Sequence, residues 1–153
     1  MRPPNALRAS LLGGAATAGA LVLLAAPASG AQRIVLGSPT FAPNGTGWGT
    51  VKPREIFNGG APSGSARHLR WRNWGGRIAR ATGKMPIYRP SGGYYRRLGD
   101  VQLKAYDRSP CAPGGPRAYR RLKVRVVDKP GGRYGRWFRW SGARTICVSP
   151  FGG

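Results

Sequence analysis

Strict alternation of apolar and polar residues is the clearest pattern in this chain. In Leu122–Val126 the apolar side chains fall on one face and cations on the other, and Asp100–Tyr106 alternates in the same way. A period of two residues is typical of a β-strand with one buried face. Both segments are therefore predicted to be strands of a half-buried sheet.

A third alternating stretch predicts a hairpin. Arg67–Trp74 alternates, meets Gly75-Gly76, and alternation resumes over Arg77–Thr82. A two-residue glycine turn would place Arg80 opposite Trp71, on the apolar face. Either the arginine stem covers Trp71 while its guanidinium reaches water, or the loop is longer and the register shifts.

Shorter strands are expected elsewhere in the chain. Arg136–Trp140, a turn at Ser141-Gly142 and Ala143–Val148 predict a closing hairpin. Weaker strand signals lie near 48–51, 55–57 and 94–98. Glycine and proline recur too often for helices after the N-terminal segment. We therefore expect an all-β fold, a single small β-sandwich or barrel over residues 47–153.

The N-terminal segment has the pattern of a secretory signal peptide. A short basic start precedes the apolar run Leu11–Ala26, and small residues follow at 28–31, where cleavage is expected. The run is shorter than the ~20 residues that a membrane span needs. We expect residues 1–30 to be the signal peptide and 31–46 a linker, leaving a secreted domain with no transmembrane segment.

The two cysteines, Cys111 and Cys147, predict one structural disulfide, because an exported domain meets an oxidising environment. Two thiols and a single histidine are too few for a structural zinc site, so no metal or cofactor is predicted. A redox pair is the alternative, but the distance between the cysteines in sequence favours a structural bridge.

The charge balance is extreme. The chain has 26 Lys and Arg against 4 Asp and Glu, a net charge of +22. Such a domain attracts polyanions at long range: an acidic wall polymer, nucleic acid or an anionic lipid surface. Arginine dominates over lysine, which suits bidentate phosphate contacts, although GC-rich coding would produce the same bias.

Cations on the outward positions of the predicted strands form a candidate polyanion site. Trp74 and Trp137 are expected to be exposed rings beside it, because they fall on the opposite parity from their core neighbours, whereas Trp71, Phe138 and Trp140 are expected to pack. A merely solvated charged face is the alternative. The predicted basic residues are Arg70, Arg72, Lys104, Arg121, Lys123 and Arg125.

Candidate catalytic groups are few. His68 is the only histidine, and Glu55, Asp100, Asp107 and Asp128 are the only acids. A catalytic histidine needs an orienting acid and a nucleophile in reach, and the sequence places neither beside His68. No catalytic residue is therefore predicted, and a small hydrolase using some of these groups is kept as an alternative.

Three motifs form a set along the chain: Gly47-Trp48-Gly49, Leu69-x-Trp71-x-x-Trp74-Gly75-Gly76, and Trp140-Ser141-Gly142-Ala143 followed by Cys147. This set resembles the motifs of small exported proteins, functionally uncharacterised, from GC-rich Gram-positive (actinobacterial) bacteria. The resemblance spans about residues 47–148. It implies export, one β-rich domain and a Cys111–Cys147 bridge, and it implies no catalytic residue.

Together these patterns predict a secreted basic β-domain, free or associated with the cell wall. The leading hypothesis is a non-catalytic binding module for an anionic cell-envelope polymer or another polyanion. The alternatives are a small secreted hydrolase and a structural envelope protein whose charge holds it at an acidic wall.

Overall fold

The computed structural model describes residues 33–150. The expected signal peptide, its cleavage positions and the start of the expected linker lie outside the described residues.

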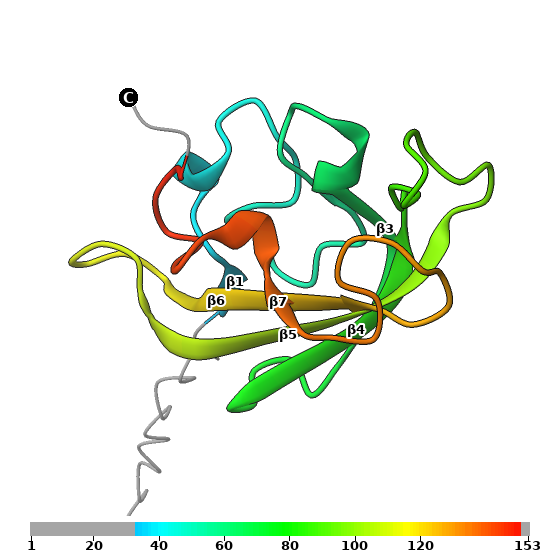
Figure 1. The fold of residues 1–153 in the computed structure, drawn as a ribbon. Helices are drawn as coiled ribbons and strands as arrows, with labels where there is room; N and C mark the ends of the chain where they lie inside the picture. Colours follow the sequence, from blue (N-terminus) through cyan, green and yellow to red (C-terminus); the bar gives the residue numbers. More distant parts are fainter. Residues whose placement is uncertain (1–32, 151–153) are drawn as a thin grey trace, which may run out of the picture.

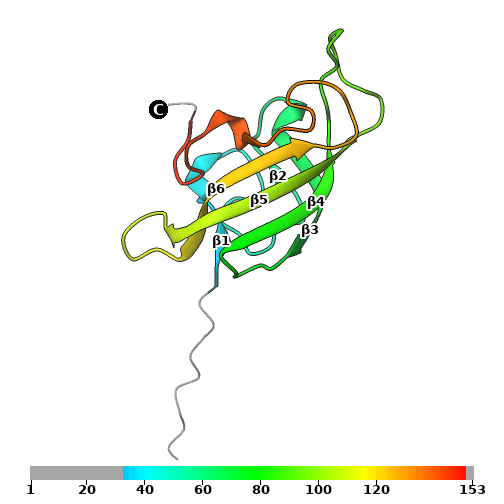
Figure 2. The ribbon, with the colours of Figure 1, turned by 60° about the horizontal axis from the view of Figure 1, so that its bottom comes forward.

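Four long strands form an antiparallel meander. They are β3 (Ser65–Arg72), β4 (Ile78–Met85), β5 (Gly99–Pro110) and β6 (Arg117–Val126). Figure 2 shows these strands side by side, with the loops behind them. The strands predicted from alternation at 100–106 and 122–126 are confirmed, and both extend further than predicted.

Short strands complete the sheet at its edges. β2 (Ile56–Phe57) pairs with β3, β1 (Val35–Leu36) pairs in parallel with the first half of β6, and β7 (Phe138–Arg139) pairs with its second half. The sheet order is β1-β6-β5-β4-β3-β2. The all-β prediction is confirmed. A sandwich or a barrel was expected, and the structure has a single sheet that curls into a half-barrel (Figure 1).

The remaining regular elements are short 3-10 helices: η1 (Pro39–Phe41), η2 (Pro62–Gly64) and η3 (Trp140–Gly142). No helix among residues 33–150 has the length and apolar character needed to cross a membrane.

The hydrophobic core fills the concave side of the sheet. Leu103 and Val124 are fully buried there, and segments from both ends of the described chain cover them, including Leu36, Phe41 and Trp140. The expectation that 31–46 is a linker is therefore wrong for its described part. Leu36 and Phe41 bury their side chains because the meander alone leaves its concave face open.

The β3–β4 hairpin has the shifted register. Arg72 pairs with Arg80 and Trp71 with Ala81, so Arg80 faces outward, while Ala79 and Ala81 face the core. The register changes between Arg67 and Arg70, where His68 has a φ of 55°. Gly83 lies opposite this bulge, and a Cβ there would stand 2.6 Å from Leu69 Cδ2.

The closing hairpin predicted at the C-terminal end is wrong. Only Phe138–Arg139 is strand, Trp140 begins η3, and Ser141 has a φ of 50°. Trp140 buries its indole in the core, 6.0 Å from the Trp48 ring, and this turns the chain away from β6. The following segment is held to β6 by the Ile146 N–H, which donates to the Arg120 carbonyl. Of the weaker signals, only the one at 55–57 forms a strand.

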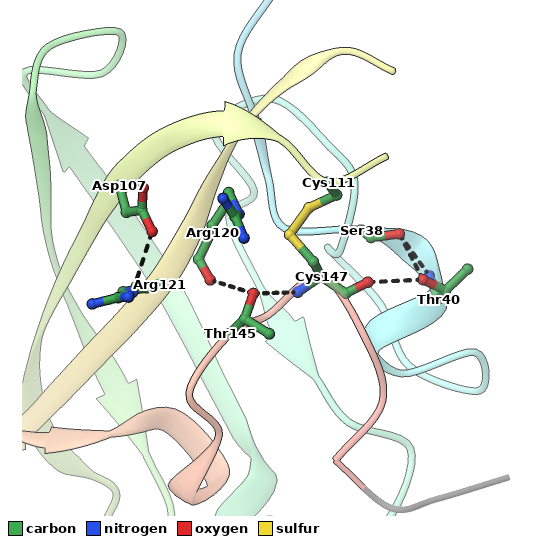
Figure 3. Close-up of a disulfide and its surroundings, with 8 residues drawn as sticks. All are labelled: Ser38, Thr40, Asp107, Cys111, Arg120, Arg121, Thr145 and Cys147. Atoms are coloured by element: carbon green, nitrogen blue, oxygen red, sulfur yellow. Dashed lines mark hydrogen bonds and ion pairs between the residues drawn. A yellow bond between two sulfur atoms is a disulfide. The ribbon is translucent and has the colours of Figure 1, made fainter. Parts of the chain in front are cut away.

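The Cys111–Cys147 disulfide is present and joins the end of β5 to the C-terminal segment (Figure 3). Thr145 Oγ1 donates to the Arg120 carbonyl, and Thr40 Oγ1 donates to the Cys147 carbonyl. The bridge thus lies where β6, η1 and the C-terminal segment meet. Its presence is consistent with a compartment outside the reducing cytoplasm.

Candidate functional site

The outer, convex face of the meander carries the candidate site. Alternation sends the apolar residues of β5 and β6 into the core and leaves the intervening side chains outside. All six basic residues predicted for a polyanion site lie on this face, which Figure 2 views directly. The structure therefore brings together side chains that are more than 50 residues apart in sequence.

Five cations stand in register across five neighbouring strands. Arg72 pairs with Arg80, Arg80 with Lys104, Lys104 with Lys123, and Lys123 with Arg139. We call these five residues the cation row. Since neighbouring strands lie about 4.8 Å apart, the row is about 19 Å long.

A second row lies two residues further along the strands. It runs Arg70, Thr82, Gln102, Arg125. Arg125 Nε donates to Gln102 Oε1 at 2.9 Å, which fixes that guanidinium against the sheet. The second row therefore adds two cations and two neutral hydrogen-bonding side chains beside the cation row.

Trp137 lies over these two rows. Lys104 Nζ is 4.5 Å from its ring centroid and the Arg125 guanidinium carbon is 5.1 Å away. The indole, half-buried, and the cations enclose a hollow of about 470 Å³. Trp137 was predicted as an exposed ring near the basic residues; it does lie among them, but its ring contacts their charges.

Trp74, by contrast, is not the exposed ring that was predicted, because it is partly buried against the core. Its ring packs edge-on against Trp71 at 4.8 Å and Tyr119 at 5.2 Å, and its Nε1 donates to the Ile34 carbonyl at 3.1 Å. The parity argument fails because Trp74 lies in the β3–β4 turn, where strand alternation no longer holds. Trp71, Phe138 and Trp140 pack against the core, as predicted.

Sequence reasoning missed two members of the cation row. Arg80 was a misfit in the two-residue turn, and only the shifted register turns it outward. The prediction placed Arg139 in a closing hairpin whose two strands pair with each other, so its pairing with Lys123 was not expected. The alternation within each segment did signal an outward cation, but the alignment between strands required the structure.

Each of the four acids forms an ion pair. Glu55 pairs with Arg67 and Asp100 with Lys84, while Asp107 pairs with Arg121 and Asp128 with Lys129. All are at least partly exposed, so solvent screens them. None of these acids pairs with a member of the cation row, whose five charges remain uncompensated by them.

His68 and Asp100 line a shared shallow hollow of about 270 Å³, together with Arg70 and Lys84. Lys84 Nζ lies 2.6 Å from Asp100 Oδ1, which commits this carboxylate to an ion pair. Over residues 33–150, no hydrogen bond joins His68 to an acid, and no three His, Cys, Asp or Glu side chains group as metal ligands. His68 therefore has no acid to orient it as the base of a Ser-His-Asp type triad.

Comparison with known proteins gives no result: no family model, no curated protein and no solved structure matches this chain. The fold and the face themselves define a small disulfide-bonded β-domain with a cationic outer surface.

Proposed function

We propose that this protein is an exported, non-catalytic domain that binds a linear anionic polymer of the cell envelope on the outer face of its sheet. The cation row carries the proposal. Five cations in register across Arg72, Arg80, Lys104, Lys123 and Arg139 match a chain of negative charges that lies across the strands.

The repulsion within the row is the physical reason to expect a ligand. Like charges directly opposite each other on neighbouring strands destabilise a sheet. A polymer that lies along the row neutralises each charge in turn and releases the counterions that both chains hold. Binding therefore removes a cost that the free domain bears.

Part of the site is already ordered. Lys104 lies against Trp137, and Arg125 is held by both Trp137 and Gln102. Side chains fixed before binding lose less conformational entropy when they meet a ligand. The hollow lined by Trp137 and these cations supports binding of a flexible polymer, which can follow the curved outer face of the sheet.

Two features of the chain support the proposed location, the N-terminal segment and the disulfide. The N-terminal pattern of a basic start and an apolar run supports export. The Cys111–Cys147 bridge supports an oxidising compartment. Secretion followed by association with an anionic wall places the cation row where its ligand is abundant.

The test compares two variants with equal charge loss. One carries Arg80→Gln, Lys104→Gln and Lys123→Gln; the control carries Arg54→Gln, Arg96→Gln and Arg97→Gln, which are exposed loop positions. Binding to linear polyphosphate, and separately to heparin, is measured over a range of salt concentrations. If each row cation meets one anion, the slope of log K against log salt falls by about 2 in the row variant.

The control should keep nearly the wild-type slope. Equal losses of slope and affinity in the two variants would show that net charge alone drives binding, as the structural-envelope alternative requires. Release of a cleaved product from either polymer during these measurements would favour the hydrolase alternative instead.

A further inference from the structure

A second hollow, of about 420 Å³, lies at the end of the outer face where the β3–β4 turn meets β5 and β6. Four arginines and one acid line it, with Ile78 and Tyr106 as its less polar part. We call it the arginine pocket. Its charged lining residues are Arg77, Arg108, Arg117, Arg121 and Asp107.

The turn that carries Arg77 is fixed to the sheet. The Tyr119 hydroxyl accepts from the Gly75 N–H at 2.9 Å and donates to the Gly76 carbonyl at 2.7 Å. Arg108 Nη1 also donates to the Gly75 carbonyl. Tyr119 is fully buried, so these contacts hold Arg77 beside the arginines of β5 and β6.

Asp107 compensates only one of the four positive charges. It has a φ of 63°, and its carboxylate lies 3.2 Å from Arg121 Nε. Arginine stays protonated at every physiological pH, so the lining keeps a net charge of +3. Four like charges around one hollow favour a compact anion of more than one negative charge.

We propose that the arginine pocket binds a terminal phosphate group, either a phosphate monoester or a diphosphate. Planar guanidinium groups hold phosphate oxygens in pairs of parallel hydrogen bonds. A phosphate monoester carries between one and two negative charges at neutral pH. A phosphodiester inside a polymer carries a single one and therefore binds this pocket less well.

The pocket adjoins the cation row, so this inference rests on the proposed function and extends it. Tyr106 lines the pocket, and Lys123 Nζ of the cation row is 5.9 Å from the Tyr106 ring. A polymer whose phosphorylated end occupies the pocket can therefore continue along the row. A free phosphate compound would offer the same group without the chain.

Titration with inorganic pyrophosphate, followed by calorimetry, tests the pocket directly. Arg77→Gln with Arg117→Gln removes two pocket cations that have no ion pair to an acid, and Arg96→Gln with Arg97→Gln removes two loop cations as the control. We expect the pocket variant to bind pyrophosphate at least about tenfold more weakly, because each lost charged hydrogen bond is worth about that factor. The control should stay within about twofold.

The row variant separates this inference from the proposed function. It should lose polyphosphate binding yet keep pyrophosphate binding within about threefold. If wild-type protein binds polyphosphate but not pyrophosphate, or if the pocket and control variants weaken pyrophosphate equally, the pocket proposal is overturned and the proposed function stands. Melting curves confirm that each variant folds.

Two otherwise identical single-stranded oligonucleotides identify the source of the phosphate. One carries a 5′-phosphate and the other a 5′-hydroxyl. Tighter binding of the phosphorylated strand, abolished in the pocket variant, supports a polymer end. Equal binding of both strands, together with tight pyrophosphate binding, supports a free phosphate compound.

Discussion

Tyr119 joins the core to the outer face of the sheet. Its ring packs against Trp74 at a centroid distance of 5.2 Å, and its hydroxyl bonds both glycines of the β3–β4 turn. Burial raises the pKa of the Tyr119 phenol above its ordinary value of 10.0, while the Gly75 N–H and the charge of Arg108 lower it in part. The neutral phenol is therefore the form that the fold requires.

This raised pKa predicts a loss of stability at high pH. Once the pH exceeds about 10, the unfolded chain releases the Tyr119 proton while the folded chain retains it, so the free energy of unfolding falls with rising pH. Urea unfolding between pH 9 and pH 11.5 measures the slope. Tyr119→Phe should be less stable at pH 9 but decline less steeply. A variant whose slope equals that of the wild type would assign the decline to lysines and other tyrosines.

At the scale of elements, alternation predicted the strands whose two faces differ most. β5 and β6 were found because each buries one face over the predicted stretch, and a one-residue slip would bury cations. The register of β3 against β4 could not be predicted, because it depends on the bulge at His68 and on Gly83 opposite it. These are contacts between segments about 15 residues apart, not patterns within either one.

The residues of the candidate site were likewise predicted only in part from the sequence. Six outward cations followed from parity within single strands, whereas Arg80 and Arg139 needed the alignment between strands. The C-terminal segment was mispredicted because burial of Trp140 outweighs its strand preference. The disulfide pairing of that segment was accessible from the sequence, because Cys111 and Cys147 are the two cysteines of the chain.

Removal of the Cys111–Cys147 bridge should destabilise the folded domain. The bridge joins residues 36 positions apart in sequence. Without it the unfolded chain gains conformational entropy, which lowers the free energy of unfolding by about 4 kcal/mol. Cys111→Ser with Cys147→Ser should lower the urea midpoint accordingly, and reduced wild-type protein should match the variant. An unchanged midpoint would show that the hydrogen bonds around Thr145 hold the segment without the bridge.

At the scale of the whole molecule, the stability of the fold and the proposed binding depend on the same charges. The chain carries a net charge of +22, and the cation row aligns five of its positive charges across the sheet. Cations so arranged repel one another unless salt or a polyanion intervenes. We therefore expect repulsion between these cations to lower the free energy of unfolding of the free domain.

Arg80→Gln tests this repulsion at an exposed position inside the row, between Arg72 and Lys104. Removal of one of the repelling charges should raise the Tm at low ionic strength by a few degrees, corresponding to about 0.5–1 kcal/mol, and weaken polyphosphate binding at the same time. The gain in Tm should vanish near 1 M salt, where the screening length is about 3 Å. Arg97→Gln removes an equal charge from a loop and should leave both quantities nearly unchanged. Because a packing effect of glutamine would persist at high salt, a Tm difference independent of salt would contradict repulsion within the row as the cause.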